Sequence, residues 1–191
     1  MFPTLVGYHN NTKFTNDVLP IANKILDGRD KNYLGHVNTY NDQEINQRLN
    51  EVKFLCDYIN FISYDYAKRT GWIIQGETEL MLFVSNMRKG EYMHSHTHPS
   101  SIISGICYLD CDEGAAPIIF EDSRDIRSFN GMISEGQIDN TKYNQYNGQE
   151  KSFIPRNGNI LVWESWIRHV VRNNEGNYRK TLVWNLYKKH D

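Results

Sequence analysis

The chain has 191 residues, a formal net charge of −2 at pH 7 and 13% aromatic residues. This length suits one folded domain, the aromatic content excludes a disordered chain, and the weak charge excludes the broad basic surface of a nucleic-acid-binding protein. Because no apolar run of about 18 residues is present, no membrane-spanning helix is expected.

The expected compartment follows from the N-terminus and the cysteines. The first residues lack the basic and apolar regions of a signal peptide. Cys56, Cys107 and Cys111 are odd in number and lack CxxC spacing, which argues against a disulfide framework and indicates a reducing compartment. We therefore expect a soluble cytoplasmic protein. The frequent Asn, Ile, Lys and Tyr residues indicate an AT-rich genome such as that of a phage, for which the compartment would be the host cytoplasm.

The N-terminal part of the chain is predicted to be mostly helical. Residues 2–8 alternate loosely between apolar and polar types, which predicts a short edge strand. Thr15 or Asn16 is a suitable N-cap for a helix that ends near Leu26. Residues 29–40 have no regular period and predict a loop or an irregular strand.

The clearest helix is predicted over residues 41–69. Asn41, followed three residues later by Glu44, is typical of a capping box, and Gly71 ends the pattern. Apolar residues keep helical spacing along one face, which predicts that the helix packs flat on a sheet. These residues are Ile45, Leu49, Val52, Leu55 or Cys56, Ile59 and Ile62.

From Gly71 onward the helical period gives way to short apolar runs separated by turn-forming residues, which predicts strands. The predicted strands are 72–74, 79–85, 101–109, 116–121, 160–163, 168–172 and 178–187. Residues 125–150 are polar and rich in Gly, Asn and Gln, and they predict a long functional or mobile insertion.

Helices followed by many strands predict an α+β protein that is mostly β. We expect a double-stranded β-helix core of the jelly-roll or cupin-like type, with the N-terminal helices packed on one sheet. The expected organisation is a single domain over residues 1–191. Residues 1–70 form the helical support, and residues 71–191 form the β core with the insertion within it.

The segment Met93–Pro99 holds His94, His96 and His98 at every second position. In an extended strand such side chains project from one face, where two neighbours can both reach a metal ion at about 2.0–2.2 Å. A third ligand must come from elsewhere in the chain, and His169 is the best candidate. A close pair and a distant histidine are typical of a metal-binding β-barrel. The alternative is a solvated histidine-rich loop.

The ligand type narrows the choice of metal. Neutral imidazoles suit Fe(II), Zn, Cu or Ni rather than Mg or Ca. Three protein ligands on one side of an octahedral ion leave positions for O₂ and a chelating cosubstrate, as an oxidative enzyme needs. A structural zinc site needs four closed ligands instead.

Arg179 and Thr181 follow on a predicted strand and face the same way, because they are two residues apart. An arginine fork beside a hydroxyl group is a good clamp for a carboxylate. The alternative is an ordinary surface arginine on a strand.

Four segments resemble the 2-oxoglutarate/Fe(II)-dependent oxygenase superfamily, and most closely an uncharacterised bacterial and phage group with HxHP…SGxxYL and SWxxHxV segments. They are His96–Leu109, Ile118–Arg124, Phe153–Val171 and Arg179–Asn185. The resemblance covers about residues 80–187. Each segment by itself is weak evidence for the family, and the order and spacing of the four segments make the resemblance specific.

The resemblance implies an enzyme that uses Fe(II) and the cosubstrate 2-oxoglutarate. It implies that His96 and His169 are catalytic residues that bind the iron. It also implies that Arg179 holds the distal carboxylate of 2-oxoglutarate, with a further hydrogen bond from Thr181 or Tyr108. The implied reaction oxidises 2-oxoglutarate to succinate and CO₂ and hydroxylates a substrate.

One position departs from the superfamily pattern, because most members have His-x-Asp at the first metal-binding strand and this chain has His98 there. A site of three histidines carries one negative charge less than the usual triad. The metal ligands are ranked as His96, His98 and His169 first, His96 and His169 alone second, and His94, His96 and His169 third.

Further residues are candidates for the mouth of the site or for an acidic contribution to it. They are Arg124, Arg127, Trp163, Trp166 and the 125–150 segment for the mouth, and Glu121 and Asp122 for the acidic contribution. No nucleic-acid or membrane motif is present. The expected substrate is a small molecule or, by analogy of fold, a protein residue. The oligomeric state stays open, with a homodimer as one option.

Two other functions fit the same residues. One is a three-histidine, cupin-type metalloenzyme that does not use 2-oxoglutarate. The other is a non-catalytic jelly-roll module with a binding or structural role.

Overall fold

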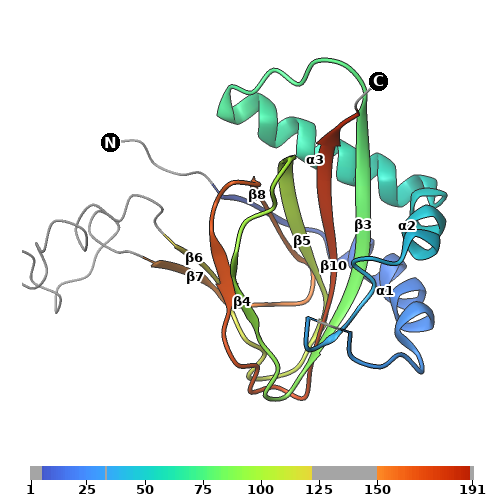
Figure 1. Ribbon diagram of the computed structural model, residues 1–191, viewed down its shortest axis with the longest axis vertical. Helices are drawn as coiled ribbons and strands as arrows, with labels where there is room; N and C mark the ends of the chain where they lie inside the picture. The colour runs from blue at the N-terminus through green and yellow to red at the C-terminus, as the bar shows by residue number, and fades with distance from the viewer. Residues whose placement is uncertain (1–5, 33, 122–149, 190–191) are drawn as a thin grey trace, which may run out of the picture.

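The computed structural model describes residues 6–32, 34–121 and 150–189. Within these ranges the chain forms two β-sheets and a layer of helices (Figure 1). The helices are α1 (Thr12–Leu26), α2 (Gln43–Asn50) and α3 (Lys53–Thr70). The strands are β1 (Gly7–Asn10), β2 (Val37–Asn38), β3 (Thr78–Arg88), β4 (Met93–His96), β5 (Ser101–Cys111), β6 (Ile118–Glu121), β7 (Glu150–Phe153), β8 (Asn159–Glu164), β9 (His169–Val171) and β10 (Tyr178–Lys188).

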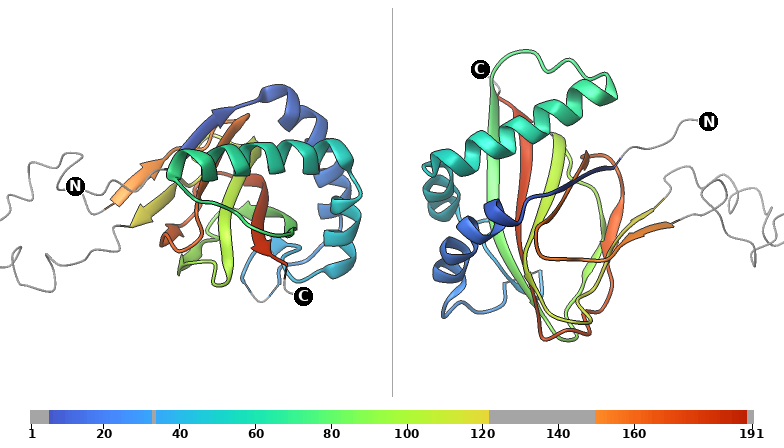
Figure 2. Two further views of the ribbon diagram at one scale, coloured as in Figure 1. Left: turned by 90° about the horizontal axis from the view of Figure 1, so that it is seen from above. Right: turned by 180° about the vertical axis from the view of Figure 1, so that it is seen from behind.

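The two sheets face each other, and the chain winds back and forth between them. The larger sheet has the order β1-β8-β5-β10-β3-β2, and the smaller sheet has the order β4-β9-β6-β7. Neighbouring strands are antiparallel throughout both sheets. The helices lie over the outer face of the larger sheet, and the smaller sheet lies on its other side (Figures 1 and 2). Consecutive strands from β3 to β6, and again from β8 to β10, alternate between the sheets, which is the winding of a double-stranded β-helix.

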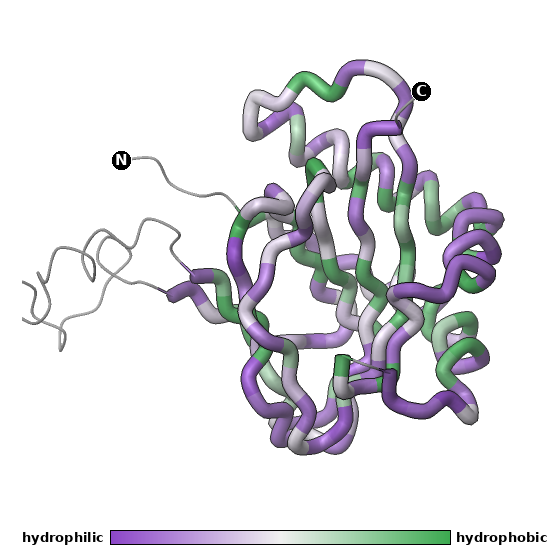
Figure 3. The backbone as a smooth tube through the Cα atoms, viewed as in Figure 1, coloured by the Kyte–Doolittle hydropathy of each residue, from purple (hydrophilic) through white to green (hydrophobic). Residues whose placement is uncertain are grey.

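This layering produces two apolar cores. Val18, Leu182 and Trp184 belong to the core between the helices and the larger sheet. Ile106 and Phe120 belong to the core between the two sheets. Hydrophobic and hydrophilic residues alternate along the helices and strands, whereas the connections at the lower end are mostly hydrophilic (Figure 3). The larger sheet is therefore buried on both faces.

Strand β10 shows how this arrangement prepares a site. Leu182 and Trp184 are buried against the helices. Because successive side chains of a strand alternate, the odd-numbered residues point between the two sheets. Arg179, Thr181 and Asn185 lie at these positions and are buried. Buried polar side chains need hydrogen-bond partners, so these residues indicate a functional site in the space between the sheets.

The predicted helix over 41–69 is wrong in one respect, because it is two helices. α2 ends at Asn50 and α3 begins at Lys53, with no side chain capping the start of α3. Apolar residues buried against the sheet lie on both sides of this break, so the period in the sequence continues across it. The C-terminal end agrees with the prediction, since Gly71 follows α3 as a left-handed cap with a φ of 82°. None of the helices in the described ranges is long and apolar enough to span a membrane.

The start of α1 also differs from the prediction. The helix begins at Thr12, before the expected caps Thr15 and Asn16. The cap is Asn11, whose Oδ1 accepts a hydrogen bond from the backbone N–H of Phe14 at 3.0 Å.

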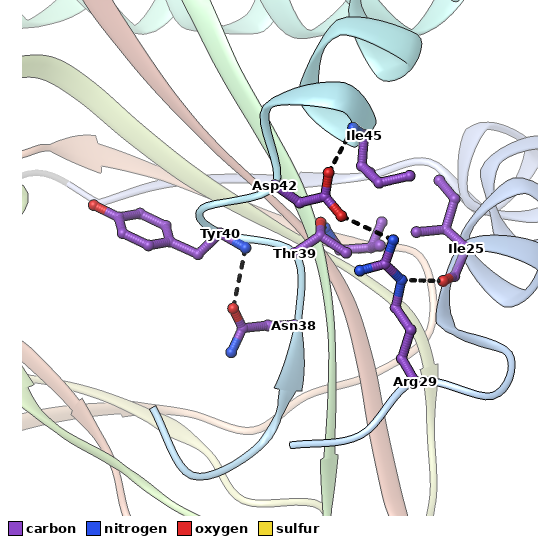
Figure 4. Close-up of polar contacts among 8 residues, drawn as sticks. Ile25, Arg29, Asn38, Thr39, Tyr40, Asp42 and Ile45 are labelled. Carbon is purple, nitrogen blue, oxygen red and sulfur yellow. Dashed lines mark hydrogen bonds and ion pairs between the residues drawn. The ribbon is translucent and has the colours of Figure 1, made fainter. Parts of the chain in front are cut away.

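Asp42, rather than the predicted Asn41, caps α2. Its Oδ1 accepts a hydrogen bond from the backbone N–H of Ile45 at 3.0 Å, and its Oδ2 pairs with Arg29 at 2.8 Å (Figure 4). Arg29 also donates from Nε to the carbonyl of Ile25 at 2.8 Å. The N–H of Ile45 and the Arg29 guanidinium hold the pKa of Asp42 below its usual value. One carboxylate thus ties the end of α1 to the start of α2.

Most predicted strands are present with bounds that differ by a few residues. These are β3, β5, β6, β8, β9 and β10. The predicted strand over 72–74 is wrong, because these residues belong to neither sheet and Ile73 is 80% exposed. Residues 2–5 of the predicted strand over 2–8 lie outside the described residues, and β1 includes its last two residues, Gly7 and Tyr8. The insertion predicted at 125–150 lies outside them as well, apart from Glu150.

Gly105 lies in the middle of β5, opposite Trp184 of β10. A Cβ atom at position 105 would lie 2.0 Å from Cζ2 of the fully buried Trp184 ring. The ring is also held by a hydrogen bond of 3.0 Å from its Nε1 to Oγ of Ser63 in α3. The absent side chain of Gly105 is therefore what lets the indole pack between the sheet and the helix.

We expect Gly105→Ala to lower the free energy of unfolding by about 3 kcal/mol, because the added methyl group overpacks the core. For a domain of this size the melting temperature should fall by roughly 6–12 °C. Chemical denaturation and melting scans measure the two quantities. In a Trp184→Leu background the same substitution should cost much less, since the clash is gone. An equal cost in both backgrounds would show that the ring is not the cause.

Candidate metal and cosubstrate site

Strand pairing brings the first two candidate metal ligands together. β4 and β9 are neighbours in the smaller sheet, and His96 lies directly opposite His169. Opposite residues of antiparallel strands have Cα atoms roughly 4.5–5.5 Å apart. The centroids of the two imidazole rings are 4.3 Å apart. Residues from distant parts of the sequence thus share one small space.

His98 joins this pair from just beyond the end of β4. Its backbone N–H donates to the carbonyl of Ser165 at 2.9 Å, in the connection between β8 and β9. Pro99 follows and cannot continue the ladder of hydrogen bonds, because it has no N–H. The ring centroid of His98 lies 5.1 Å from that of His96 and 5.0 Å from that of His169.

The three imidazoles converge with the spacing of a metal site. One nitrogen from each of His96, His98 and His169 lies within 4.8 Å of the others, and the Nε2 atoms of His98 and His169 are 3.2 Å apart. Two nitrogens that bind one ion at about 2.1 Å lie about 3.0–3.4 Å apart for octahedral or tetrahedral angles. This pair therefore has the separation that a shared ion requires. No other three possible ligands in the described part of the chain form such a group.

Backbone carbonyls decide which ring nitrogens are available. Nδ1 of His96 lies 2.7 Å from the carbonyl oxygen of His94, and Nδ1 of His169 lies 3.0 Å from that of Ile167. A carbonyl oxygen only accepts hydrogen bonds, so each Nδ1 carries the proton and each Nε2 presents a lone pair. Metal-binding histidines are commonly oriented in this way.

The electrostatic environment keeps these rings neutral. Burial, followed by the effect of His96, lowers the pKa of His98 to about 3. Burial, followed by the effects of His96 and His98, lowers the pKa of His169 to about 3. Burial also lowers the pKa of His96, against the opposing effect of its hydrogen bond to the His94 carbonyl. Neutral imidazole is the form that binds Fe(II) and the other late transition metals.

His94 lies outside the group, although its spacing predicts the same strand face as His96. Its exposed ring packs against Tyr92, with 4.9 Å between the ring centroids. The pairing of β4 with β9 is irregular just before His96, and such a bulge breaks strict alternation. Glu121 also lies outside the group and accepts a hydrogen bond from the hydroxyl of Ser95.

Arg179 places a guanidinium group inside the same space between the sheets. The residue is only 3% exposed. Its Nε donates to the carbonyl of Ala116 at 3.0 Å, and its Nη2 donates to the hydroxyl of Tyr108 at 3.4 Å. None of these partners is an anion, and no carboxylate of the described residues pairs with the guanidinium. A buried arginine without a counter-charge is suited to bind an anionic ligand.

Thr181 and Tyr108 complete this end of the interior. They are register partners on β10 and β5. Oγ1 of Thr181 is buried and has no hydrogen-bond partner within the described ranges. Burial raises the pKa of Tyr108 to about 12, although Arg179 acts in the opposite direction, so the phenol stays protonated and can donate. A guanidinium and two hydroxyl groups are a donor set that fits a carboxylate.

Sequence comparison agrees with the chemistry of this site. The family described as "Putative 2OG-Fe(II) oxygenase" matches residues 81–185, which is more than half of the chain. The chain belongs to this family. A comparison with the sequences of curated proteins found no match.

Three solved structures are similar to this 2OG-Fe(II) oxygenase over nearly its whole length. The viral collagen prolyl hydroxylase vCPH of Paramecium Bursaria Chlorella virus-1, in its 2OG complex, has 11% identity and a TM-score of 0.57, with 96% of both chains covered. A Pseudomonas putida prolyl-4-hydroxylase has 11% identity and a TM-score of 0.58, with 98% of this chain and 94% of that chain covered. HygX from Streptomyces hygroscopicus, with nickel and 2-oxoglutarate bound, has 10% identity and a TM-score of 0.60, with 97% and 83% covered. Together they confirm the predicted α+β fold, a double-stranded β-helix with N-terminal helices.

The residues expected at the mouth of the oxygenase site differ in where the structure places them. Trp163 is 1% exposed and lies 5.0 Å from His169 between ring centroids, so it is an inner wall of the site. Trp166 is half-exposed in the connection between β8 and β9. The other predicted residues lie outside the described ranges, namely Arg124, Arg127 and Asp122.

Several buried polar residues of the oxygenase interior belong to the segments that resemble the superfamily, but the sequence assigns them no role. Oγ of Ser104 donates to Oδ1 of Asn185 at 2.7 Å, and it lies 2.8 Å from Oγ of Ser165. A signal for Asn185 was available, because it lies an even number of residues after Arg179 on one strand and so shares its face. Ser104 and Ser165 are the serines of the SGxxYL and SWxxHxV segments, but their contact could not be predicted, since it depends on how β5 meets the β8–β9 connection.

Proposed function

We propose that this chain is an Fe(II)- and 2-oxoglutarate-dependent hydroxylase. His96, His98 and His169 hold the metal, and Arg179 holds the distal carboxylate of the keto acid. The bound metal supplies the chelation of the keto acid and the activation of O₂. In the overall reaction 2-oxoglutarate is decarboxylated to succinate and CO₂; one oxygen atom of O₂ enters succinate, and the other enters a substrate C–H bond as a hydroxyl group.

The observation that carries the proposal is the convergence of three neutral imidazoles inside a barrel that also holds a buried arginine. The Nε2 separation of 3.2 Å between His98 and His169 supports a shared ion. The lack of an anionic partner for Arg179 among the described residues supports a carboxylate ligand. A metal site alone would not need the arginine, and an anion site alone would not need three neutral imidazoles.

Each side chain has a distinct task in this proposal. The planar fork of Arg179 binds and orients the distal carboxylate, which fixes the other end of the keto acid at the metal. The Tyr108 phenol or the Thr181 hydroxyl adds a hydrogen bond to the same carboxylate. The rings of Phe120 and Trp163 pack beside His169 and exclude water, which strengthens electrostatic interactions within the site.

His98 changes the charge of the site relative to the usual His-x-Asp pattern of the superfamily. Three neutral ligands leave both positive charges of Fe(II) uncompensated by the protein. A keto acid with two negative charges is then attracted more strongly, because opposite charges interact strongly in a buried site. We propose that this third imidazole is compatible with cosubstrate binding for that reason.

We further propose that the substrate is a small molecule or a protein residue. Proteins of similar fold support both kinds, since one is described as a prolyl-4-hydroxylase and HygX has hygromycin B bound in its structure. The half-exposed indole of Trp166, next to the backbone that anchors His98, is available for contact with such a substrate.

Melting scans with metal and keto acid test the proposed function. We expect Ni(II) or anaerobic Fe(II) to raise the melting temperature of EDTA-treated protein, and 2-oxoglutarate to raise it further only when metal is present. A ligand at 100 times its Kd stabilises by about 2.7 kcal/mol, which is roughly 5–10 °C for a chain of this length. With Fe(II) and O₂, the protein should also form succinate from 2-oxoglutarate.

The other outcomes separate the alternative functions. Stabilisation by metal with no effect of 2-oxoglutarate and no succinate would favour a three-histidine metalloenzyme whose substrate binds the metal directly. No effect of metal or of keto acid would favour a non-catalytic jelly-roll module. Either result would overturn the proposed function.

A further inference from the structure

A further group of side chains lies on the inner face of the larger sheet, at the opposite end of β10 from Arg179. Tyr187 follows Arg179 by eight residues, so its side chain points to the same side, about 26 Å further along the strand. The register partners of Tyr187 are Glu79 on β3 and Ser101 on β5. Oγ of Ser101 lies 3.3 Å from the carbonyl oxygen of His98. This end of the sheet is therefore the metal-binding end.

Aromatic and thioether side chains surround Tyr187. Met81 and Phe83 share the face of Glu79, because side chains alternate along β3. The hydroxyl of Tyr187 donates to Sδ of Met81 at 3.8 Å. Tyr40, just beyond β2, packs edge-on against Phe83 with 5.1 Å between the ring centroids, and its ring points away from the start of α2 (Figure 4). Phe83 is 8% exposed and belongs to neither apolar core, so these rings form a separate group.

The barrel is open to solvent at this end. Arg179 is buried, whereas Tyr187 is half-buried and the neighbouring Glu79 is exposed. Val183, which lies between Arg179 and Tyr187 on the same face of a central strand, is half-buried rather than buried. Solvent therefore reaches the inner face of the sheet from the end where Tyr187 lies. The residues at this opening, named the mouth group, are Tyr40, Glu79, Met81, Phe83 and Tyr187.

The hydroxyl of Tyr187 is occupied, so its ring is the surface that remains for a ligand. Besides its contact with Met81, the phenol has a hydrogen bond with the side chain of Asn185. Burial, followed by the effect of Tyr40, raises the pKa of Tyr187, although the hydrogen bond with Asn185 acts in the opposite direction. Glu79 raises this pKa as well, so its carboxylate lies near the phenol. The phenol stays neutral, and the faces of the ring carry the negative potential of an aromatic quadrupole.

Glu79 gives the mouth group a negative charge. It forms no ion pair within the described ranges, and the neighbouring Lys189 pairs with Glu77 at 2.9 Å. A carboxylate beside aromatic rings favours a cation, because both the ring quadrupole and the carboxylate attract positive charge. An anion would be repelled, and an uncharged apolar ligand would gain nothing from the carboxylate. The chemistry of the group therefore fits an ammonium ion.

We propose that the mouth group binds an ammonium group of the substrate, either the amine of a lysine side chain or that of a free alkylamine. This inference rests on the proposed function and names the substrate class of the same site. Asn185, two residues before Tyr187, lies in one row with Ser104 and Trp163, about 10 Å across the sheet from the indole. The Trp163 ring is 5.0 Å from that of His169. An amine held at the mouth group thus leaves the carbon chain of the substrate to extend toward the metal ligands.

Three compounds separate the charge of the ligand from its carbon chain. N-acetyl-lysine methylamide represents a lysine residue, and pentylamine represents a free alkylamine. N-acetyl-norleucine methylamide has the carbon chain of lysine without the amine. Binding of each compound is measured by NMR titration, without turnover, both to protein loaded with Ni(II) and 2-oxoglutarate and to metal-free protein. We expect the norleucine compound to bind roughly 10-fold more weakly than the lysine compound.

Variants of the mouth group test which side chains attract the cation. We expect Glu79→Gln and Tyr187→Leu each to weaken the binding of both amines roughly 3–30-fold, because each removes part of the attraction for positive charge. Glu79→Gln should not change the binding of the norleucine compound. Tyr187→Phe keeps the ring and should retain most of the amine binding. Glu77→Gln is the matched control, since Glu77 pairs with Lys189, and it should leave amine binding at the wild-type level.

Turnover identifies the source of the ammonium group. With Fe(II), 2-oxoglutarate and O₂, the bound amine should raise succinate formation and gain a hydroxyl group itself, and the norleucine compound should do neither. Tighter binding and faster turnover of the lysine compound would support a protein residue as the substrate. The reverse order would support a small alkylamine.

The outcomes are distinguishable from those for the proposed function. Absence of amine binding, equal binding of the lysine and norleucine compounds, or unchanged amine binding in both Glu79→Gln and Tyr187→Leu would overturn the inference. Binding of 2-oxoglutarate and succinate formation by the wild type would then leave the proposed function intact. Absence of 2-oxoglutarate binding to the metal-loaded wild type would overturn both. The melting temperature of each variant shows whether the fold is retained.

Discussion

Replacement of His169 by alanine is expected to abolish stoichiometric metal binding and, with it, succinate formation. His169 is buried, presents Nε2 through its Nδ1 hydrogen bond, and lies 3.2 Å by Nε2 from His98. Loss of an outer-shell partner of a metal ligand already costs roughly 10–100-fold in affinity, and loss of the ligand itself should cost more. Metal content after dialysis against Ni(II), and succinate formed from 2-oxoglutarate with Fe(II), measure the two effects.

His94→Ala is the matched control, since it removes a histidine from the same strand. His94 is exposed and packs on Tyr92 outside the group, so metal content and succinate formation should stay at the wild-type level. His98→Ala decides between two and three imidazole ligands and is expected to lose metal as His169→Ala does. Full metal content in His98→Ala would restrict the ligands to His96 and His169. Full content in His169→Ala would contradict the site altogether.

The fold could be predicted because the patterns that define it are local. Helical periods in the first third of the chain and short apolar runs after Gly71 indicate helices and strands in the order that a helix-covered double-stranded β-helix requires. The same patterns predicted a strand at 72–74, where the apolar side chains of Trp72 and Ile73 are in fact exposed. Apolar type alone does not tell whether a neighbouring strand is present to pair with.

The histidine group could be predicted only in part from the sequence. Alternate spacing correctly places His96 and His98 near each other, but it also predicts His94 on the same face. Because the strand pairing is irregular just before His96, the side chain of His94 lies outside the imidazole group. Such an irregularity depends on the partner strand β9. The juxtaposition of His96 and His169 likewise depends on the register of two strands that are distant in the sequence.

Asn185 shows a second limit of prediction from the sequence, which concerns hydrogen bonds between strands. Its position on the face of Arg179 follows from counting along one strand, but its hydrogen bond to Ser104 depends on the register between β10 and β5. Satisfaction of a buried polar group is a property of the folded chain, since it depends on Ser104 of a neighbouring strand. Residue type and spacing do not reveal it.

Arg179→Met is expected to lower the affinity of the metal-loaded protein for 2-oxoglutarate about 100-fold or more, because a fork of charge-assisted hydrogen bonds to the distal carboxylate is lost. The substituted side chain keeps much of the volume of arginine, so the core remains filled. Metal content should not change, since the arginine is not a member of the imidazole group. Calorimetry with Ni(II) and 2-oxoglutarate measures the affinity.

The stability of the ligand-free protein gives this prediction a second, independent readout. A buried cation without a counter-charge is unfavourable, and replacement of such a group by an apolar side chain of similar size is often neutral or stabilising. The melting temperature of Arg179→Met without ligand should therefore be equal to or above that of the wild type, while its increase with metal and 2-oxoglutarate should be lost.

Arg179→Lys separates charge from geometry. It retains the positive charge but not the planar fork, so its affinity for 2-oxoglutarate should fall between those of Arg179→Met and the wild type. If Arg179→Met kept wild-type affinity, the guanidinium would not be the carboxylate clamp. If Arg179→Met lost both affinity for 2-oxoglutarate and ligand-free stability, the hydrogen bond from Arg179 to the Ala116 carbonyl would stabilise the fold. The main role of the arginine would then be structural.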